Sequence, residues 1–382
     1  MNYRKLGNTG LTVSEIGLGC EGFSEDNYKN ARPMLDTAEK LGINYIDLYT
    51  SDPDVRLKVG EALAGRRDKF ILQAHICSVW KDGQYKRSRE IGEVREAAEQ
   101  IFNLLGTEYV DVGMIHYVDS MRDWENVLSG GVMDYVKALK AEGRIKHIGL
   151  SSHNPEVALE AVKSGIIEVL MFSVNPCYDL LPASEDVEAL WDEKNYREKL
   201  VNMDPKRQEL YETCQSMGVG ITVMKAFGGG DLLDEKLSPA GKSLTVSQCI
   251  HYALTRPAAS TVLAGAHSAE ELENCALYSD ACAEEKDYAQ ALAEFPNVSW
   301  KGHCMYCSHC APCPKMIDVA SVTKFLNLAK AHGRVPETVR EHYELLKAHG
   351  GQCIACGACE SRCPFEVNII ENMREAAEVF GK

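Results

Sequence analysis

The sequence predicts an α/β protein, in which a closed (β/α)8 (TIM) barrel is followed by a smaller all-helical domain. Two observations carry this prediction. Over most of the chain, short apolar runs rich in β-branched residues alternate with longer helical patterns. Near the end this alternation stops, and eight cysteines gather in two runs, Cys304–Cys313 and Cys353–Cys363. We therefore predict a barrel over residues 1–285 and a helical domain over residues 286–382.

The bulk composition narrows the class of protein. The 382 residues are 45% hydrophobic and 25% charged, which is ordinary for a globular chain. The net charge of −15 argues against a nucleic-acid partner or an anionic membrane surface. The N-terminus lacks the apolar stretch of a secretory signal, and no apolar run has the length of a membrane span. Together with seven further cysteines that show no metal spacing, these features favour a cytoplasmic location.

The elements follow from the hydrophobic pattern. Residues 2–13 predict a hairpin, and the long stretch Asp179–Asp204, which contains Trp191, predicts an enlarged loop over the barrel mouth. The expected strands are Ile16–Gly19, Tyr45–Leu48, Phe70–His75, Val110–Ile115, His147–Leu150, Val169–Ser173, Gly220–Met224 and Thr261–Ala264. The expected helices are Ala31–Leu41, Val55–Leu63, Ile91–Leu105, Val132–Glu142, Glu156–Lys163, Pro205–Met217, Val246–Thr255 and Ala269–Tyr278. Eight β/α units favour a closed barrel, and no G-x-G-x-x-G motif supports an open doubly wound sheet.

The two cysteine runs have the spacing of iron–sulfur ligands. The second run is C-x2-C-x2-C-x3-C followed by Pro364, which is the spacing of bacterial ferredoxins; the first is one residue shorter and is followed by Pro314. In such pairs the fourth cysteine commonly binds the neighbouring cluster. We therefore expect two [4Fe–4S] clusters with crossed ligation in a ferredoxin-like domain. Cys304, Cys307, Cys310 and Cys363 would hold one cluster, and Cys353, Cys356, Cys359 and Cys313 the other.

Zinc and disulfides are the alternatives for these cysteines. Structural zinc usually takes two C-x2-C pairs, or pairs mixed with histidine, rather than two quartets each closed by Cys-Pro. Disulfides do not fit a chain without an export signal. His303 and His309 lie next to the first run, but eight cysteines already complete two clusters. Both histidines are therefore expected to be bystanders.

Polar residues follow the strands at the end where barrels carry their active sites. Asp47, Tyr49 and Asp52 follow the second strand, His75 ends the third, and His116 follows the fourth. Carboxylate and imidazole groups that converge on one mouth can shuttle protons. Each also has a structural alternative: the aspartates can cap a helix, and the histidines can be hydrogen-bonded core residues.

A glycine-rich segment follows the seventh strand. Lys225 and then Gly228 and Gly229 stand there, and Gly265 ends the eighth strand. Backbone N–H groups at this position often bind cofactor phosphates in barrels, although glycine runs also form ordinary turns. The pocket could take the phosphate of a nicotinamide cofactor or of a flavin.

The chain resembles the aldo/keto reductase family, in the branch that carries a C-terminal iron–sulfur domain. The matching segments are YRKLGNTGLTVSEIGLG, GINYIDLY, DKFILQAHI, EYVDVGMIHYVD, GRIKHIGLSSH, GVGITVMKAFGGG and STVLAGAHSAEELENC, and they cover nearly the whole barrel.

The resemblance implies an Asp, Tyr, Lys and His tetrad. Asp47 and His116 match the Asp and the His, whereas Asp52 stands where the Tyr is expected and His75 where the Lys is expected. The general acid and the group that lowers its pKa are therefore both replaced. Tyr49, Tyr117 or a protonated His75 are candidates for the acid.

The resemblance also implies a nicotinamide site. Met171 stands where the family often has a carboxamide-binding Gln. No Lys or Arg occurs within residues 257–285 to bind a 2′-phosphate, and Arg256 precedes the eighth strand. NADH is therefore at least as plausible as NADPH. The cofactor-binding residues expected from the match are Ser151, Ser152, Lys225, Gly228, Gly229, Gly265, Ala266, His267, Glu271 and Asn274.

These observations lead to three hypotheses for function. The first is an iron–sulfur oxidoreductase that reduces or oxidises a small carbonyl or unsaturated substrate, with electrons passed through the clusters from an electron-donor protein and with a nicotinamide or flavin assisting. The second is an isomerase or lyase that uses His75 and His116, with structural clusters. The third is an electron-transfer module with an inactive barrel. The first hypothesis expects the clusters near the rim that bears Asp47 and His116; clusters on the far side of the barrel, walled off from that rim, would make the tail a brace or a docking piece.

Overall fold

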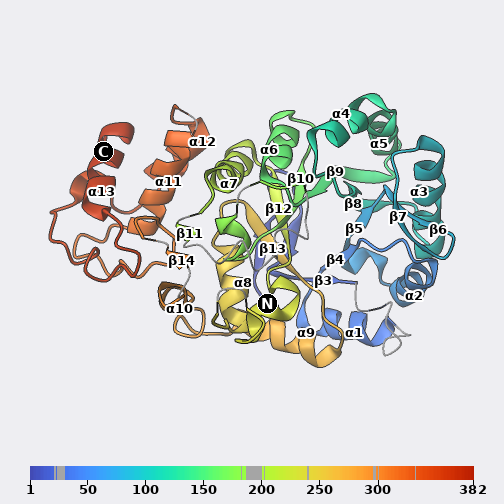
Figure 1. Cartoon of the computed structure of the whole chain (residues 1–382), viewed down its shortest axis with the longest axis horizontal. Coiled ribbons are helices and arrows are strands. Elements are labelled where there is room, and N and C mark those ends of the chain that lie inside the picture. The colour runs from blue at the N-terminus through green and yellow to red at the C-terminus, as the bar shows by residue number, and fades with distance from the viewer. Residues whose placement is uncertain are drawn as a thin grey trace.

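The protein is a closed eight-stranded barrel with a helical lobe at its side (Figure 1). The computed structural model describes residues 1–20, 23, 31–181, 183–185, 200–201, 203–238, 241–295, 298–299, 301–331 and 333–382. Within these residues the strands run in parallel around the barrel in the order β10-β12-β13-β3-β4-β5-β8-β9. The predicted TIM barrel is confirmed.

The barrel strands match the predicted positions closely. Five predicted strands have the observed bounds, and the other three differ by one or two residues at one or both ends. The strands are β3 (Ile16–Gly19), β4 (Tyr45–Leu48), β5 (Ile71–His75), β8 (Val110–Ile115), β9 (Ile145–Ser152), β10 (Val169–Ser173), β12 (Gly220–Met224) and β13 (Ala259–Ala264). All but the first residue of β5, the last of β12 and two near the start of β9 are buried, which explains their continuous apolar runs.

Helices cover the outside of the barrel. Leu35 of α1, Phe102 of α3 and Leu210 of α7 are buried against the strands. The helices are α1 (Arg32–Leu41), α2 (Pro53–Leu63), α3 (Ile91–Leu105), α4 (Met121–Ser129), α5 (Val132–Ala141), α6 (Pro155–Lys163), α7 (Pro205–Met217), α8 (Val246–Leu254) and α9 (Ala269–Ala276). The sequence pattern predicted each of them except α4.

An antiparallel hairpin closes the amino-terminal end of the barrel. It consists of β1 (Tyr3–Lys5) and β2 (Thr12–Ser14), as the sequence predicted. Leu6 and Val13 are fully buried in the interior cluster with Tyr45 of β4. Because this end is filled with side chains, only the carboxyl ends of the strands leave room for a cavity.

A second hairpin, which the sequence analysis did not predict, follows β5. Its strands are β6 (Ser78–Lys81) and β7 (Gln84–Arg87), and they pair in antiparallel register. The turn between them is Asp82-Gly83, with positive φ at both residues (53° and 75°). A two-residue Asp-Gly turn is a strong hairpin signal in any sequence, so the hairpin could have been predicted.

The predicted long loop is described only in part. Within Asp179–Asp204 the structure shows the end of the short 3-10 helix η3 (Tyr178–Leu180) and β11 (Leu200–Val201), whose parallel partner is β14 (Val298–Ser299). Trp191 lies outside the described residues.

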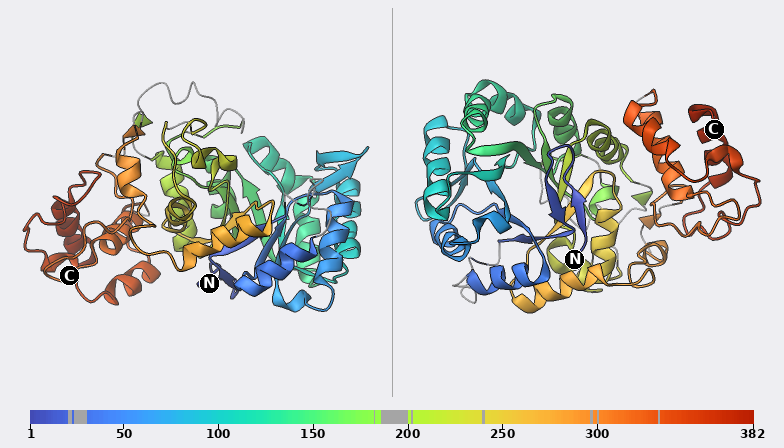
Figure 2. Two further views of the ribbon diagram at one scale, coloured as in Figure 1. Left: turned by 90° about the horizontal axis from the view of Figure 1, so that it is seen from below. Right: turned by 180° about the vertical axis from the view of Figure 1, so that it is seen from behind.

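The C-terminal lobe is helical and contains the cysteine runs (Figure 2). Tyr343 of α12 stacks on Phe380 of α13, with ring centroids 3.9 Å apart. The helices of the lobe are α11 (Val319–Ala331), α12 (Glu337–Glu344) and α13 (Ile369–Phe380). The short helix α10 (Ala289–Ala293) precedes them in the segment that connects barrel and lobe. All four lie within residues 286–382, where the sequence predicted a helical domain.

A buried arginine joins the lobe to the barrel. Arg256, which follows α8, is 2% exposed and donates hydrogen bonds to the backbone oxygen of Met305 (2.7 Å) and to the hydroxyl of Tyr288 (3.3 Å). Its guanidinium lies 4.4 Å above the ring centroid of Tyr252. Arg256 is therefore a structural residue of this contact and is not placed to bind a cofactor phosphate.

The lobe lies beside α7 and α8, whereas β4, β5 and β8 lie on the other side of the barrel (Figures 1 and 2). The expectation that the cysteine runs lie close to the rim with Asp47 and His116 is therefore wrong. The two regions share one chain but occupy opposite flanks.

We expect the substitution Arg256→Met to weaken the contact between lobe and barrel. The Met305 carbonyl would keep the hydrogen bond from the Tyr288 hydroxyl (2.6 Å) but lose the one from the charged guanidinium, and a hydrogen bond to a charged group contributes about 1.5–3 kcal/mol. The measurements are the thermal midpoint of unfolding and the rate at which a protease releases the lobe. Arg122→Met, at an exposed site on α4, serves as the control. Equal midpoints and equal cleavage rates for the two variants would contradict the assigned role.

Candidate active site and cysteine-lined cavities

A large cavity lies at the carboxyl ends of the barrel strands. It encloses about 1020 Å³ and reaches from β4, β5 and β8 across the mouth to the segments that follow β12 and β13. Asp52 and Ser152 are the two predicted site residues that do not line it. Those that line it are Asp47, Tyr49, His75, His116, Ser151, Lys225, Gly228, Gly229, Gly265, Ala266, His267, Glu271 and Asn274.

Three predicted catalytic residues form a hydrogen-bonded row. They come from the adjacent strands β4, β5 and β8, whose parallel pairing brings their carboxyl ends together. Nε2 of His75 lies 3.1 Å from Oδ1 of Asp47, and Nδ1 of His75 lies 2.6 Å from Nδ1 of His116. The exposed fractions of Asp47, His75 and His116 are 2%, 1% and 7%. These groups are therefore held in fixed positions at the wall of the cavity.

Gln73 holds the carboxylate of Asp47 from the barrel interior. Its amide nitrogen donates to Oδ1 of Asp47 (2.7 Å) and to the sulfur of Met171 (3.4 Å), and its amide oxygen accepts from the hydroxyls of Tyr45 (2.7 Å) and Thr222 (3.2 Å). Because every polar atom of this buried amide has a partner, its orientation is fixed. The sequence analysis missed Gln73; a Gln inside a buried strand was the available signal.

His116 is kept neutral by its surroundings. Burial, followed by the nearby His75 and Arg89, lowers the pKa of His116 well below its usual value. A neutral imidazole has one donor and one acceptor nitrogen, so each of its two short contacts has a defined direction.

Tyr85 is a site residue that the sequence analysis did not identify. It lies on β7, lines the cavity, and places its hydroxyl 2.8 Å from Nε2 of His116. The ring is 46% exposed, and partial burial raises the pKa of Tyr85. Tyr85 belongs to a hairpin outside the barrel, so the rule that active-site residues follow barrel strands did not select it.

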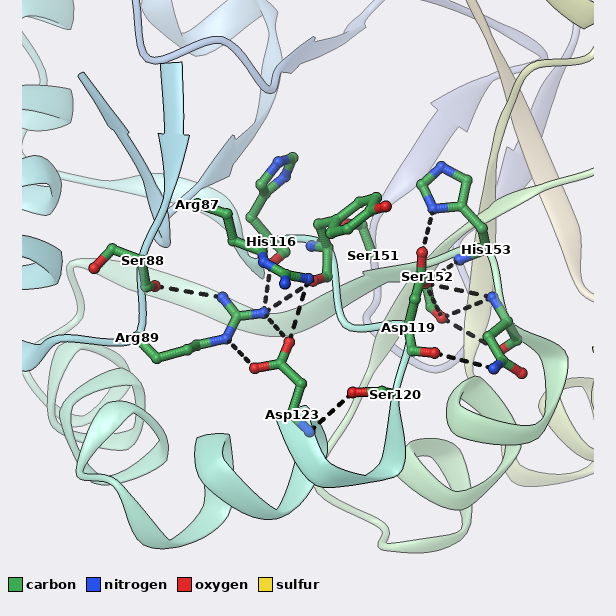
Figure 3. Close-up of polar contacts among 12 residues, drawn as sticks. Arg87, Ser88, Arg89, His116, Asp119, Ser120, Asp123, Ser151, Ser152 and His153 are labelled. Carbon is green, nitrogen blue, oxygen red and sulfur yellow. Dashed lines mark hydrogen bonds and ion pairs between the residues drawn. The ribbon is translucent and has the colours of Figure 1, made fainter. Parts of the chain in front are cut away.

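The backbone that carries His116 is held by two arginine contacts (Figure 3). Nη2 of Arg89 donates to the carbonyl oxygens of His116 (2.8 Å) and Tyr117 (2.9 Å). The same guanidinium binds both carboxylate oxygens of Asp123, at 2.9 and 2.7 Å. Tyr117 has a positive φ of 54°, and its N–H donates to Ser151 Oγ at 2.8 Å. The turn after β8 is therefore fixed from both sides.

A second buried carboxylate, Asp119, organises the turn after β9 (Figure 3). It accepts hydrogen bonds from the Ser152 hydroxyl (2.8 Å) and from the backbone N–H of His153 (2.6 Å). Its other oxygen lies 2.9 Å from Nδ1 of His153, and the His153 ring lines the cavity. These bonds lower the pKa of Asp119 even though its burial acts in the opposite direction. Ser152 is thus engaged within the fold, whereas Ser151 faces the cavity.

Asp52 has a structural role. Its side chain accepts a hydrogen bond from the N–H of Asp54 (2.9 Å) and caps the start of α2. The position at which the aldo/keto reductase pattern expects a tyrosine is therefore a helix cap, and we withdraw Asp52 from the candidate catalytic residues.

The opposite wall of the cavity has the character of a cofactor site. Gly228 and Gly229 lie in the short helix η6 (Gly228–Leu233) with positive φ values of 60° and 72°. Glu271 of α9 accepts a hydrogen bond from the N–H of His267 (2.8 Å). The Glu271 carboxylate lies at the N-terminus of α9, where free backbone N–H groups would otherwise suit a phosphate.

Two small cavities in the C-terminal lobe are each lined by four of the eight cysteines. Val319 lines both cavities, which therefore lie next to each other. One cavity is lined by Cys304, Cys307, Cys310 and Cys363, and the other by Cys313, Cys353, Cys356 and Cys359. The structure thus groups the cysteines in the two crossed sets that the spacing predicted.

The loops between these cysteines contain several residues with left-handed backbone. Tyr306, Ser308, Ala355 and Gly357 have positive φ values between 52° and 73°. The N–H of Ala355 donates to the sulfur of Cys353 at 3.4 Å.

Arg362 ties the two cysteine runs together. It donates to the backbone oxygens of His309 (3.3 Å), Cys310 (2.6 Å) and Pro312 (2.8 Å). Among the described residues, which include all eight of these cysteines, no three His, Cys, Asp or Glu residues lie close enough together to hold a single metal ion.

The protein is thus a (β/α)8 barrel with a row of buried carboxylate and imidazole groups in its mouth, and sequence comparison gives its family. Residues 15–249 match the aldo/keto reductase family. The chain is 30% identical over 290 residues to the uncharacterized oxidoreductase YqkF of Bacillus subtilis (strain 168), covering 71% of this chain and 89% of that protein. This chain belongs to the aldo/keto reductase family.

Other relatives agree with this assignment. The holo form of aldo-keto reductase AKR11C1 from Bacillus halodurans superposes with a TM-score of 0.60 at 25% identity, covering 76% of this chain and 96% of that chain. The L-glyceraldehyde 3-phosphate reductase of Escherichia coli (strain K12) is 26% identical over 205 residues, covering 50% of this chain and 57% of that protein. The family match ends at residue 249, before the cysteine runs begin. In the part of the chain that the structure describes, no helix has the length and apolar character needed to cross a membrane.

We expect His116 to stay neutral at a pH where an ordinary histidine is largely protonated. Since the folded protein holds the pKa of His116 well below about 6.5, the imidazole should show no protonation step as the pH falls from 7.5 to 5.5. NMR of histidine-labelled protein measures this, and His116→Gln assigns the resonance. The unfolded chain binds this proton more readily, so the site lowers stability as the pH falls through 6.5. A titration of His116 centred near 6.5 would contradict the assignment.

Proposed function

We propose that this aldo/keto reductase interconverts a small carbonyl or unsaturated compound with its reduced product, and that its C-terminal lobe binds two [4Fe–4S] clusters that exchange electrons with a donor protein. The observation that carries the redox proposal is the buried row Asp47, His75 and His116 at the wall of a cavity that extends to a glycine-rich cofactor wall. The fixed imidazole pair can take up or release the proton that accompanies reduction of a carbonyl.

The cofactor wall supports a nicotinamide donor, the usual reductant of this family. A bound nicotinamide would supply a hydride. Ser151, the backbone of Gly228 and Gly229, and the side chains of Glu271 and Asn274 would hold it. Glu271 at the start of α9, together with the absence of Lys and Arg from residues 257–285, favours NADH over NADPH. A flavin phosphate could occupy the same glycine segment.

The geometry of the cysteines supports iron–sulfur clusters over zinc. Four thiolates bind one zinc ion at about 2.3 Å each, which requires them to converge on a point. The eight cysteines instead surround two cavities without such a convergence. A four-iron cube is wider than one ion and suits this arrangement, and bound cubes would supply single electrons. The N–H bond to Cys353 is of the kind that tunes such clusters.

The position of the lobe restricts how the clusters can serve the barrel. The lobe lies beside α7 and α8, on the flank opposite β4 and β5. The cavity wall nearest to that flank includes Val246, the first residue of α8, together with Asp231 and Leu233 of η6. Electron exchange between clusters and cavity would therefore occur on the cofactor side and not beside His75 and His116. Cys356 is exposed, so the cavity that it lines is the one accessible to a donor protein.

Family membership favours the redox hypothesis over the isomerase or lyase alternative. The row Asp47, His75 and His116 is complete and hydrogen-bonded, which gives no support to an inactive barrel.

Anaerobic turnover tests the redox proposal. Purified protein with its clusters intact is given NADH, NADPH or reduced viologen and a panel of small aldehydes, ketones and enones. We expect turnover with at least one donor, and a loss of about 10² to 10⁴-fold in kcat for His116→Gln, as for the removal of a general acid–base group. Absence of turnover with every donor, together with absence of nicotinamide and flavin binding, would overturn the proposal.

Iron analysis tests the crossed ligation. Two cubes contain about eight irons per chain, and loss of one cube leaves about four. Cys313→Ala combined with Cys356→Ala removes two ligands from one cavity, so we expect about four irons and the spectrum of one remaining cube. Cys313→Ala combined with Cys310→Ala damages both cavities and should abolish both cubes.

Cys282→Ala is the matched control, because Cys282 is exposed and lies outside both cavities. If the Cys313 and Cys356 pair of substitutions removed all the iron while the Cys313 and Cys310 pair retained half of it, ligation would follow the sequence runs instead.

A further inference from the structure

Four side chains form a continuous chain of hydrogen bonds from the barrel wall to the hairpin. Asp47 Oδ1 and His75 Nε2 are 3.1 Å apart, the two Nδ1 atoms of His75 and His116 are 2.6 Å apart, and His116 Nε2 lies 2.8 Å from the hydroxyl of Tyr85. The exposed fraction rises from 2% at Asp47 to 46% at Tyr85. We call these four residues the proton relay.

When both imidazoles are neutral, the carboxylate fixes the direction of each hydrogen bond in the proton relay. An ionised carboxylate only accepts, so Nε2 of His75 carries a proton. A neutral His75 then accepts at Nδ1, which requires His116 to donate from its own Nδ1. The remaining nitrogen of His116 accepts from the Tyr85 hydroxyl. With both imidazoles neutral, every donor meets an acceptor and no contact is left between like groups.

The hairpin holds Tyr85 in place. Arg87 on the same strand donates to the carbonyl oxygen of Tyr117 (2.8 Å), and Lys86 pairs with Glu93 of α3 at 2.7 Å. Ser51 donates to the carbonyl oxygen of Val79 on the paired strand at 2.9 Å. The phenol therefore stays beside His116 without needing a substrate to order it.

We propose that Tyr85 is the catalytic acid and base of this enzyme, which exchanges a proton with the substrate oxygen while His116, His75 and Asp47 pass the proton on. This inference rests on the proposed carbonyl reduction. It assigns the role of the tetrad tyrosine to a residue on a different structural element, the β6–β7 hairpin.

The step balances in both directions. In the loaded relay His75 carries a second proton: it donates from Nε2 to Asp47 and from Nδ1 to Nδ1 of His116. His116 then donates from Nε2 to the oxygen of Tyr85, and Tyr85 donates to the carbonyl oxygen of the substrate. A bound reduced nicotinamide would supply the hydride to the carbonyl carbon, and Tyr85 would give its proton to the oxygen as the C=O π bond breaks. His116 Nε2 reprotonates Tyr85, and His75 Nδ1 reprotonates His116 Nδ1. One proton and one hydride are added, and the relay returns to its neutral form.

The other two tyrosines near the row have a different relation to His116. The Tyr49 ring stacks on the imidazole, with centroids 6.4 Å apart and planes at 24°, and the Tyr117 ring centroid lies 6.1 Å away. These are contacts between ring faces, whereas Tyr85 meets a ring nitrogen through its hydroxyl.

The test compares Tyr85→Phe with two kinds of control. Tyr3→Phe removes a hydroxyl of similar exposure (49%) that bonds to the carbonyl of Gly42, far from the site. Tyr49→Phe and Tyr117→Phe test the neighbouring rings. We expect kcat for the best carbonyl substrate to fall by about 10² to 10⁴-fold in Tyr85→Phe, with nucleotide binding unchanged, to stay within about threefold of wild type in Tyr3→Phe, and to fall less in Tyr49→Phe and Tyr117→Phe than in Tyr85→Phe. A wild-type kcat in Tyr85→Phe, or an equal loss in Tyr49→Phe or Tyr117→Phe, would overturn the assignment.

A measurement that needs no substrate separates this inference from the proposed function. In ¹⁵N-histidine NMR, the wild-type protein should show His116 protonated on Nδ1, with Nε2 shifted by its hydrogen bond; Tyr85→Phe should remove that shift, and Tyr3→Phe should not. An active wild-type enzyme with an unchanged His116 signal in Tyr85→Phe would refute the relay while the proposed function stands. A changed signal in a protein that turns over no carbonyl would refute the proposed function and leave only the hydrogen-bond assignment.

Discussion

The carboxylate of Asp47 is the constraint on which the rest of the site depends. It is buried, it accepts from the Gln73 amide and the His75 imidazole, and it has no capacity to donate while ionised. The tautomers of both histidines and the direction of the Tyr85 hydroxyl follow from it. Since Gln73 also bonds to Tyr45 and Thr222, residues of the barrel interior hold the Asp47 carboxylate in place. The packing of the barrel therefore also fixes the geometry of the proposed proton relay.

Two opposite walls of the cavity carry different kinds of residue. Proton-handling groups come from β4, β5, β8 and the β6–β7 hairpin, whereas the glycine segment and the start of α9 form the wall suited to a cofactor. The cysteine lobe lies beside α7 and α8, where the buried Arg256 joins it to the barrel. The cysteine-lined cavities and the buried imidazole pair therefore lie on different flanks of the barrel.

The family pattern and the structure diverge at two tetrad positions, and each divergence has a local cause. Asp52 caps α2, which begins directly after it with Pro53, so that position stabilises a helix. His75 accepts and donates within a row of imidazoles, which a lysine with only donors could not do. The hydroxyl that meets His116 comes instead from Tyr85, on a hairpin inserted after β5.

The sequence by itself predicted the barrel, because apolar runs at regular intervals specify strands and helices locally. It also predicted the grouping of the cysteines, because in paired runs of ferredoxin spacing the fourth cysteine commonly joins the other set of three. It also placed Asp47, His75 and His116 at the ends of adjacent strands. Only the tertiary structure decided that Tyr85 reaches His116, that Gln73 orients Asp47, and that the lobe lies on the opposite flank. Those facts depend on contacts between residues that are far apart in the sequence. A local sequence pattern does not specify such contacts.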